Sequence, residues 1–423
     1  MTFAPQVMAM AIVSAVALAM AGCGGGGDGG DNAPPALATV VPPMPLPGPY
    51  SVACSNVAQD FERVPPGDAV DSYWKGSRST SGTPRYLTDL LADPANTLSV
   101  TITVPDDTTL YGSFAGSRVA YVLLACYPTV ANNPRPGYPL PTGVVVPHMQ
   151  TGMDAPLFTD AAARYPLLAF SHGYRGSPLG GDYMTAMSIF ASYGYLVVAP
   201  FHGDGRVADL NVEELGDVVT VISQLRDFVA LQALRPLSMS AAIDLMLAHP
   251  QWKDHVNAAQ IGGFGASMGG ETMMLMGGAG LTTSVEMAWT RTPVDPRLKA
   301  AVGYVPYFGA PLLPAFGRNQ HGLDGITLPY LAIAGTADVT APMLMTEQGL
   351  RRLGGTRELV ALAGLKHEFD VASSDDIFTW ALTFLEAEVR GTASARQQLA
   401  AMASVSGGAD DRVVIPYNGL VPR

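Results

Sequence analysis

The sequence predicts an α/β fold, with a mostly parallel central sheet covered by helices on both faces. Two observations carry this prediction. Short apolar runs recur along the chain, and segments with helical spacing lie between most of them. Such runs are typical of strands buried on both faces, and parallel strands need a long, usually helical, connection between them. With 423 residues, of which 48% are hydrophobic, the chain is long enough to bury one large core.

The first elements follow an N-terminal region with little periodicity. Residues 50–97 are rich in Gly, Pro, Ser and Asp, so we expect an irregular arm there. At 98–104 apolar and polar residues alternate, which indicates a half-exposed antiparallel strand. The remaining predicted strands are the apolar runs at 119–126, 167–170, 195–199, 261–264, 300–305, 330–334 and 359–362. Helices are predicted at 183–193, 237–248, 343–353 and 377–389.

Two segments fall outside this alternation of strands and helices. Residues 204–240 mix apolar and acidic side chains, and both a lid over a site and a plain pair of surface helices fit them. Residues 396–423 are expected to form a C-terminal tail, which leaves 98–395 as the α/β domain.

The N-terminal sequence predicts export of the protein. Its apolar run at 7–21 is too short for a comfortable membrane span and has the length of a signal-peptide core, so we predict a signal peptide over 1–22. Two interpretations of its cleavage compete. Residues 19–21 fit the small-x-small rule, whereas residues 20–23 resemble a lipobox, in which Cys23 is lipidated. We favour the lipoprotein, held in the periplasm or outer membrane by a flexible tether over 23–49; the alternative is a freely secreted protein.

Once Cys23 is assigned to processing, only Cys54 and Cys126 remain. An even pair in an oxidising compartment predicts a disulfide bond. Closing so long a loop contributes about 4 kcal/mol in the chain-entropy model. The alternative is two buried free thiols.

The charge balance and the cysteine and histidine spacing exclude other classes. The net charge of −12 argues against nucleic-acid binding, because phosphate neutralisation needs basic clusters. The sequence contains no His-x-x-x-His pair, and the cysteines lack zinc-type neighbours, so no metal or other cofactor is predicted. We expect a monomer whose membrane contact is limited to the lipid anchor.

The most informative motif is the stretch 265–269, Gly-Ala-Ser-Met-Gly, which places Ser267 between two glycines. It lies between a predicted strand and a segment with helical character. A serine in this context is typical of a nucleophile elbow, a turn so tight that glycine is needed on either side. The turn exposes the hydroxyl above the sheet.

An acid and a base follow Ser267 at expected positions. Asp338 comes just after the run 330–334, and His367 comes after the last strand. Because the carboxyl ends of parallel strands meet at one edge of a sheet, these side chains are expected to lie together. A serine needs a base to become nucleophilic, and the base needs a carboxylate to orient it. Other carboxylates follow His367 or start a helix, so we favour Asp338; these are Asp370, Asp375 and Asp376.

A loop after an early strand, residues 170–176, completes the predicted site. We expect the backbone amides of Tyr174 and Met268 to form an oxyanion hole, in which each donor lowers the barrier by about 3 kcal/mol. His172, Arg175 and His202 are candidates for substrate contact. His172 is also expected to shape the loop through hydrogen bonds.

These motifs, over roughly residues 98–390, resemble the α/β-hydrolase superfamily. The similarity is greatest to dienelactone-hydrolase-like, platelet-activating-factor-acetylhydrolase-like and cutinase-like polyester esterases. It implies the α/β-hydrolase fold and cofactor-free cleavage of a small or polymeric carboxylic ester through a Ser-His-Asp triad and an acyl-enzyme. Acyl transfer, amide cleavage and a non-catalytic binding role on the same scaffold are the alternatives.

Two positions depart from those groups. Ser267 stands where dienelactone hydrolases carry cysteine, and Ala266 stands where polyester cutinases usually carry His or Trp.

Overall fold

The computed structural model describes residues 38–76, 85–208, 222–311 and 313–419. The signal peptide predicted at 1–22, the lipidation site Cys23 and the first part of the tether lie outside the described residues. The same is true of 209–221 within the expected insert. Over the described ranges, no helix combines the length and apolarity needed to cross a bilayer.

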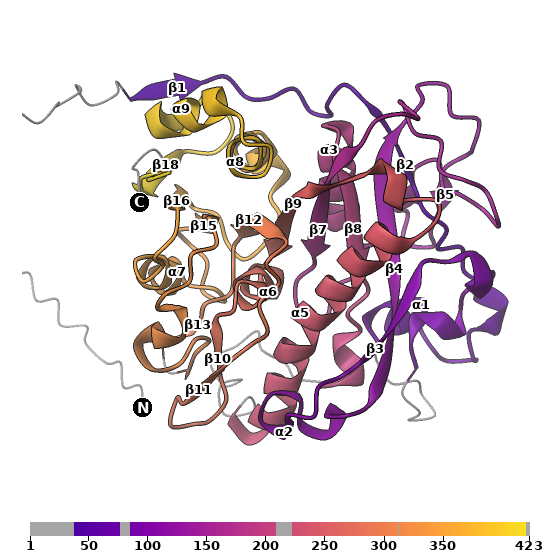
Figure 1. Ribbon diagram of the computed structural model, residues 1–423, viewed down its shortest axis with the longest axis horizontal. Coiled ribbons are helices and arrows are strands. Elements are labelled where there is room, and N and C mark those ends of the chain that lie inside the picture. The colour runs from indigo at the N-terminus through magenta and orange to yellow at the C-terminus, as the bar shows by residue number, and fades with distance from the viewer. Residues whose placement is uncertain (1–37, 77–84, 209–221, 312, 420–423) are drawn as a thin grey trace, which may run out of the picture. The chain divides into compact units, whose positions relative to one another are not determined.

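A mixed sheet of ten strands lies at the centre of the described part (Figure 1). Its strands are β2 (Ser51–Cys54), β3 (Ser99–Thr103), β4 (Arg118–Thr129), β7 (Tyr165–Ser171), β8 (Leu196–Pro200), β9 (Val256–Ala266), β12 (Leu298–Tyr304), β15 (Tyr330–Gly335), β16 (Arg357–Leu362) and β18 (Asp411–Ile415). They are ordered β18-β16-β15-β12-β9-β7-β8-β4-β2, and β3 also pairs with β4.

The six strands from β8 to β16 in this order are parallel, and the outer strands are antiparallel. The predicted α/β class with a largely parallel sheet is therefore confirmed. The described residues also form four two-stranded pairs. These are β1 (Thr39–Val41) with β17 (Met402–Val405), β5 (Tyr138–Pro139) with β6 (Val145–Val146), β10 (Gly280–Thr282) with β11 (Trp289–Arg291), and β13 (Gly309–Ala310) with β14 (Leu313–Pro314).

Two strands of the central sheet come from segments where none was expected. β2 lies in the region predicted as an irregular arm, and β18 lies in the region predicted as a tail. Both are short, at four and five residues, and neither is fully buried. Neither segment has the continuous apolar pattern that marks the central strands, so the pairing partner, rather than the local sequence, makes each of them a strand.

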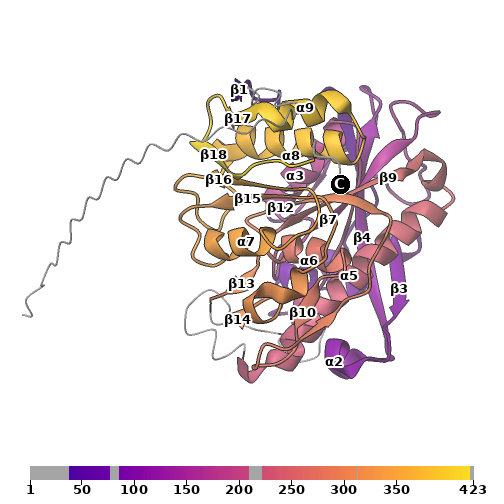
Figure 2. The same ribbon diagram turned by 60° about the vertical axis from the view of Figure 1, so that its left-hand side comes forward.

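Helices cover both faces of the sheet (Figures 1 and 2). They are α1 (Val70–Lys75), α2 (Thr108–Tyr111), α3 (Gly181–Ser192), α5 (Leu225–Ala248), α6 (Met268–Met276), α7 (Met343–Leu350), α8 (Ser374–Glu388) and α9 (Ala393–Ala401). Side chains of α3 and α8 pack into one hydrophobic core, and those of α5, α6 and α7 pack into another. Successive residues of β7 alternate between the two cores, as a strand buried on both faces requires.

The helix α5 is much longer than the helix expected at 237–248. It begins at Leu225, so residues 225–240 of the expected insert form its first part and pack against the sheet. It contains Pro236 and has many buried side chains. A helix with an internal proline and with buried side chains on most of its faces lacks a clear amphipathic period. The full length of α5 could therefore not be predicted from the sequence pattern.

The disulfide predicted between Cys54 and Cys126 is present. The two residues face each other directly across β2 and β4, and both are fully buried. The bond ties a short edge strand to the sheet across 72 residues of sequence.

The strand order creates a crevice beside β7. From β7 the chain passes through α3 to β8 on one side, and β9 lies on the other side of β7. The connections that leave the carboxyl ends of β7 and β9 therefore run in opposite directions. In sheets of this kind, ligands bind at the point between two such strands. β7 ends at Ser171 and β9 ends at Ala266.

Candidate active site

Ser267 occupies a strained turn between β9 and α6. Its backbone angles are φ 53° and ψ −120°, a conformation that L residues rarely adopt and that recurs at functional sites. A Cβ atom on Gly265 would lie 2.1 Å from the carbonyl oxygen of Gly269. A Cβ atom on Gly269 would lie 2.0 Å from the carbonyl oxygen of Ser171. Both glycines are therefore required, because α6 begins in direct contact with β9 and β7.

A chain of hydrogen bonds joins Ser267, His367 and Asp338. The distance from Ser267 Oγ to His367 Nε2 is 2.8 Å, and that from His367 Nδ1 to Asp338 Oδ2 is 2.7 Å. The Asp338 side chain is fully buried, whereas His367 is 22% exposed and so open to the site. The other oxygen of Asp338 accepts the amides of Thr340 and Ala341, at 2.9 and 2.7 Å.

These contacts determine which ring nitrogen of His367 carries the proton. Asp338 accepts from Nδ1–H of His367, which leaves Nε2 free to accept the proton of the Ser267 hydroxyl. A serine so placed can be deprotonated as it attacks, and the carboxylate stabilises the imidazolium that forms. The structure thus brings together the three residues that the sequence singled out.

The predicted oxyanion loop lies beside Ser267. A Cβ atom on Gly173 would be 3.4 Å from Cβ of Ser267, and the amide of Gly173 donates to Tyr183 Oη at 3.1 Å. Tyr174 follows directly. On the other side, Met268 is the first residue of α6, where an amide has no carbonyl within its own helix to donate to.

A buried ion pair between Arg235 and Asp204 holds the backbone of this loop in place through hydrogen bonds. Arg235 donates to the carbonyl oxygens of His172 and Gly173, at 2.7 and 2.9 Å. It also donates to both oxygens of Asp204, at 3.0 and 2.7 Å, and each side chain is 1% exposed. Asp204 in turn accepts the amide of Arg175 at 2.7 Å. Burial alone would raise the pKa of Asp204, but the charge and hydrogen bonds of Arg235 hold it below its usual value.

Two buried histidines extend this network. His172 accepts the amide of His202 on Nε2 and donates from Nδ1 to the carbonyl of Gly173, at 3.3 and 2.8 Å. His202 bonds Ser171 and Ser238, at 2.9 and 3.0 Å. Burial lowers the pKa of His172 to about 4 and that of His202 well below its usual value, so both rings are neutral at pH 7.

This placement bears on the residues considered for substrate contact. His172 and His202 are 0% and 3% exposed, and their ring nitrogens all have hydrogen-bond partners within the protein. Arg175 contributes its amide to Asp204. These residues shape the loop, as expected of His172, and none of them is among the residues that line the cavity at Ser267.

Glu271 is a further buried group that the sequence did not single out. It lies in the first turn of α6, is 0% exposed, and accepts from Gln232 Nε2 at 2.6 Å. Its second carboxylate oxygen is buried without a partner. Burial raises the pKa of Glu271 to about 8. The sequence signal for a buried charge at Glu271 was a single acidic residue in a mostly apolar helix. Arg235, a single basic residue within an apolar run of α5, was a signal of the same kind.

The cavity at Ser267 and His367 has a volume of about 460 Å³. Its walls are rich in aromatic side chains and carry two carboxylates, and no Lys or Arg is among the described residues that line it. The aromatic residues are Phe170, Tyr183, Phe264, Tyr304 and Phe369, and the carboxylates are Asp182 and Glu368. Tyr304 donates to the carbonyl of Glu368 at 2.6 Å, which fixes the loop that carries His367.

Comparison with known proteins adds no family to this geometry. No protein-family model matches the chain, and no curated protein matches it. Within the described ranges, no group of three or more His, Cys, Asp or Glu side chains is placed to hold a metal ion.

Proposed function

We propose that this protein is a serine hydrolase of carboxylic esters with the α/β-hydrolase fold. The observation that carries the proposal is the hydrogen-bonded series Ser267–His367–Asp338, whose members follow the carboxyl ends of β9, β16 and β15. The strained turn at Ser267 and the strand order around β7 support it.

In the proposed reaction, His367 takes the proton of Ser267 as Oγ attacks the ester carbonyl. The tetrahedral oxyanion then accepts from the amides of Met268 and Tyr174, and the alcohol leaves with the proton from His367. Water, deprotonated by the same histidine, releases the acid from the acyl-enzyme. Asp338 stabilises the imidazolium in both steps.

The cavity suggests the class of ester. Its aromatic walls favour apolar or aromatic acyl groups, because such groups lose most from staying in water. Asp182 and Glu368 repel anionic substrates, and no cation lines the described cavity to offset them. We therefore expect 4-nitrophenyl benzoate to be cleaved faster than the same ester with a 4-carboxylate on the acyl ring. The neutral substitutions Asp182→Asn and Glu368→Gln should narrow that difference.

The activity is tested with short p-nitrophenyl esters and a fluorophosphonate probe. Wild-type protein should turn over the esters and be labelled at Ser267, and Ser267→Ala should abolish both. Ser406→Ala, an exposed serine outside the site, is the matched control and should behave as wild type. Full activity in Ser267→Ala would exclude the proposed mechanism.

We also propose that the protein is exported and anchored through Cys23. The Cys54–Cys126 disulfide is compatible with an oxidising compartment. Labelling cells with a radioactive fatty acid should mark the wild-type protein but not Cys23→Ser. Equal labelling of both proteins would exclude lipidation at this cysteine.

A further inference from the structure

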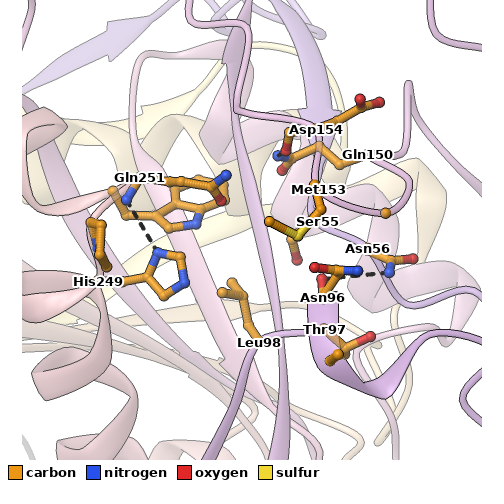
Figure 3. A pocket seen from close by; sticks show the side chains of 14 residues that line it. Ser55, Asn56, Asn96, Thr97, Leu98, Gln150, Met153, Asp154, His249 and Gln251 are labelled. Atoms are coloured by element: carbon orange, nitrogen blue, oxygen red, sulfur yellow. Dashed lines mark hydrogen bonds between the residues drawn. The ribbon is translucent and has the colours of Figure 1, made fainter.

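A second cavity, of about 320 Å³, shares no residue with the one at Ser267. It lies where β2 ends and β3 begins, and its other side is formed by the residues that follow α5 (Figure 3). These residues lead into the start of β9, whereas Ser267 follows the end of that strand. The two cavities are therefore separate sites.

One wall of this cavity is fixed by the disulfide and carries an unsatisfied acceptor. The amide of Gln150 donates to the carbonyl of Cys54 at 2.9 Å, so the disulfide strand positions this residue. Gln150 is 4% exposed, and its Nε2 donates to the carbonyl of Asp154 at 2.8 Å. Its Oε1 is buried with no partner. Because a buried acceptor without a partner is costly, this atom calls for a donor from a bound molecule.

The facing wall offers further polar groups. Figure 3 shows His249 and Gln251 on one side of the cavity, and Gln150, Asn56 and Asn96 on the other. The Nδ1 atom of His249 accepts the amide of Gln251 at 3.3 Å, so a neutral ring carries its proton on Nε2 as a donor. The amide side chains supply both donors and acceptors.

The charge of the lining narrows the class of ligand. Among the described residues that line the cavity, Asp154 is the only Asp, Glu, Lys or Arg, and it already pairs with Arg135 at 3.4 Å. An anion would meet no cation there. An apolar molecule would leave the buried Oε1 of Gln150 without a partner. A neutral molecule with several hydroxyl groups satisfies these donors and acceptors without burying a charge.

We propose that this cavity binds an uncharged, hydroxyl-rich ligand of the size of a sugar ring, independently of the site at Ser267. The volume is at the lower end of the range for small-molecule sites, about 300–1,000 Å³. A turn of the Gln150 side chain, whose Oε1 is covered by its neighbours, lets a ligand hydroxyl donate to this atom, and other hydroxyls bond His249 and Gln251 on the opposite wall.

Calorimetric titration of the full-length protein with glucose, galactose and N-acetylglucosamine tests this proposal. At least one sugar should bind saturably in the millimolar range, and glucose 6-phosphate and cyclohexanol should bind more weakly. Gln150→Leu and Gln251→Ala should each weaken binding about tenfold, the effect of losing one good hydrogen bond. Gln397→Leu, at an exposed glutamine of α9, is the matched control.

Several outcomes would overturn the proposal. They are no saturable binding of any of the three sugars, tighter binding of glucose 6-phosphate than of glucose, or unchanged binding in Gln251→Ala. That variant decides the matter if Gln150→Leu does not fold, because Gln251 is only half-buried. Ser267→Ala should bind the sugar like wild type. Loss of binding in that variant would contradict the independence of the two sites, whatever the outcome of the esterase assay.

Discussion

The buried pair of Arg235 and Asp204 allows a quantitative prediction about the oxyanion loop. Replacing Asp204 by Asn removes the charge that compensates Arg235 while keeping the size of the side chain. Both partners are 1% exposed, and two hydrogen bonds of 2.7 and 3.0 Å join them. Breaking a buried pair by removing one partner costs about 3–5 kcal/mol, because the remaining charge stays buried without compensation.

The same substitution should lower activity. Asp204 holds the amide of Arg175, and Arg235 holds the carbonyls of His172 and Gly173. Movement of this loop would misplace the Tyr174 amide, and losing one oxyanion donor reduces kcat by roughly 10²–10³-fold. The double variant Asp204→Leu with Arg235→Met should recover much of the stability, because it leaves no unpaired charge, but not the activity.

Guanidinium unfolding followed by circular dichroism, together with ester kinetics, measures both effects. The control is Asp71→Ala, which breaks the exposed ion pair between Lys75 and Asp71. The nitrogen–oxygen distance of this pair, 2.8 Å, is close to the 2.7 Å of the buried pair, and its loss should cost less than about 1 kcal/mol. The reasoning is refuted if Asp204→Asn costs no more than Asp71→Ala, or if the double variant regains wild-type kcat.

Three further predictions concern the site and the fold. Asp338→Asn should reduce kcat about 10⁴-fold with little change in KM, because the histidine loses its correct tautomer; equal loss of kcat and gain of KM in steady-state assays would argue against this. Glu271 has a folded-state pKa of about 8 against 4.5 in the unfolded chain, so its stabilising contribution is complete below pH 4.5 and is lost as the pH rises toward 8. Glu271→Gln should abolish that loss, roughly 1.4 kcal/mol per pH unit, and parallel stability curves of the two proteins between pH 5 and 8 would contradict the assignment. Replacing both Cys54 and Cys126 by Ala should lower the unfolding free energy by about 4 kcal/mol for a separation of 72 residues, and a urea midpoint equal to that of the oxidised wild type would exclude this contribution.

Much of the candidate site was predictable from local sequence. The glycines around Ser267 are required by contacts within the turn and with the adjoining strand. The local sequence motif is therefore enough to predict the geometry of the turn. The positions of Asp338 and His367 after apolar runs predicted that both lie at one edge of a parallel sheet. Both residues lie there, and His367 is hydrogen-bonded to Ser267 and to Asp338.

The support around those residues was not predictable in the same way. Arg235 lies inside a helix whose pattern is interrupted by Pro236, and Asp204 begins a short 3-10 helix after β8. Nothing within a few residues of either one indicates its partner. Their pairing follows only once α5 packs against the sheet beside the end of β7.

Local sequence was enough to predict the α/β class, the disulfide partners and the three residues joined at Ser267. Each of these follows from periodicity, from sterics between near neighbours, or from there being only two cysteines left to pair. Four features became visible only in the folded protein: the strands β2 and β18, the buried Arg235–Asp204 ion pair, the unpartnered carboxylate oxygen of Glu271 and the polar cavity at Gln150. Strand pairing, burial and electrostatic compensation depend on residues far apart in the chain, and only folding brings those residues together.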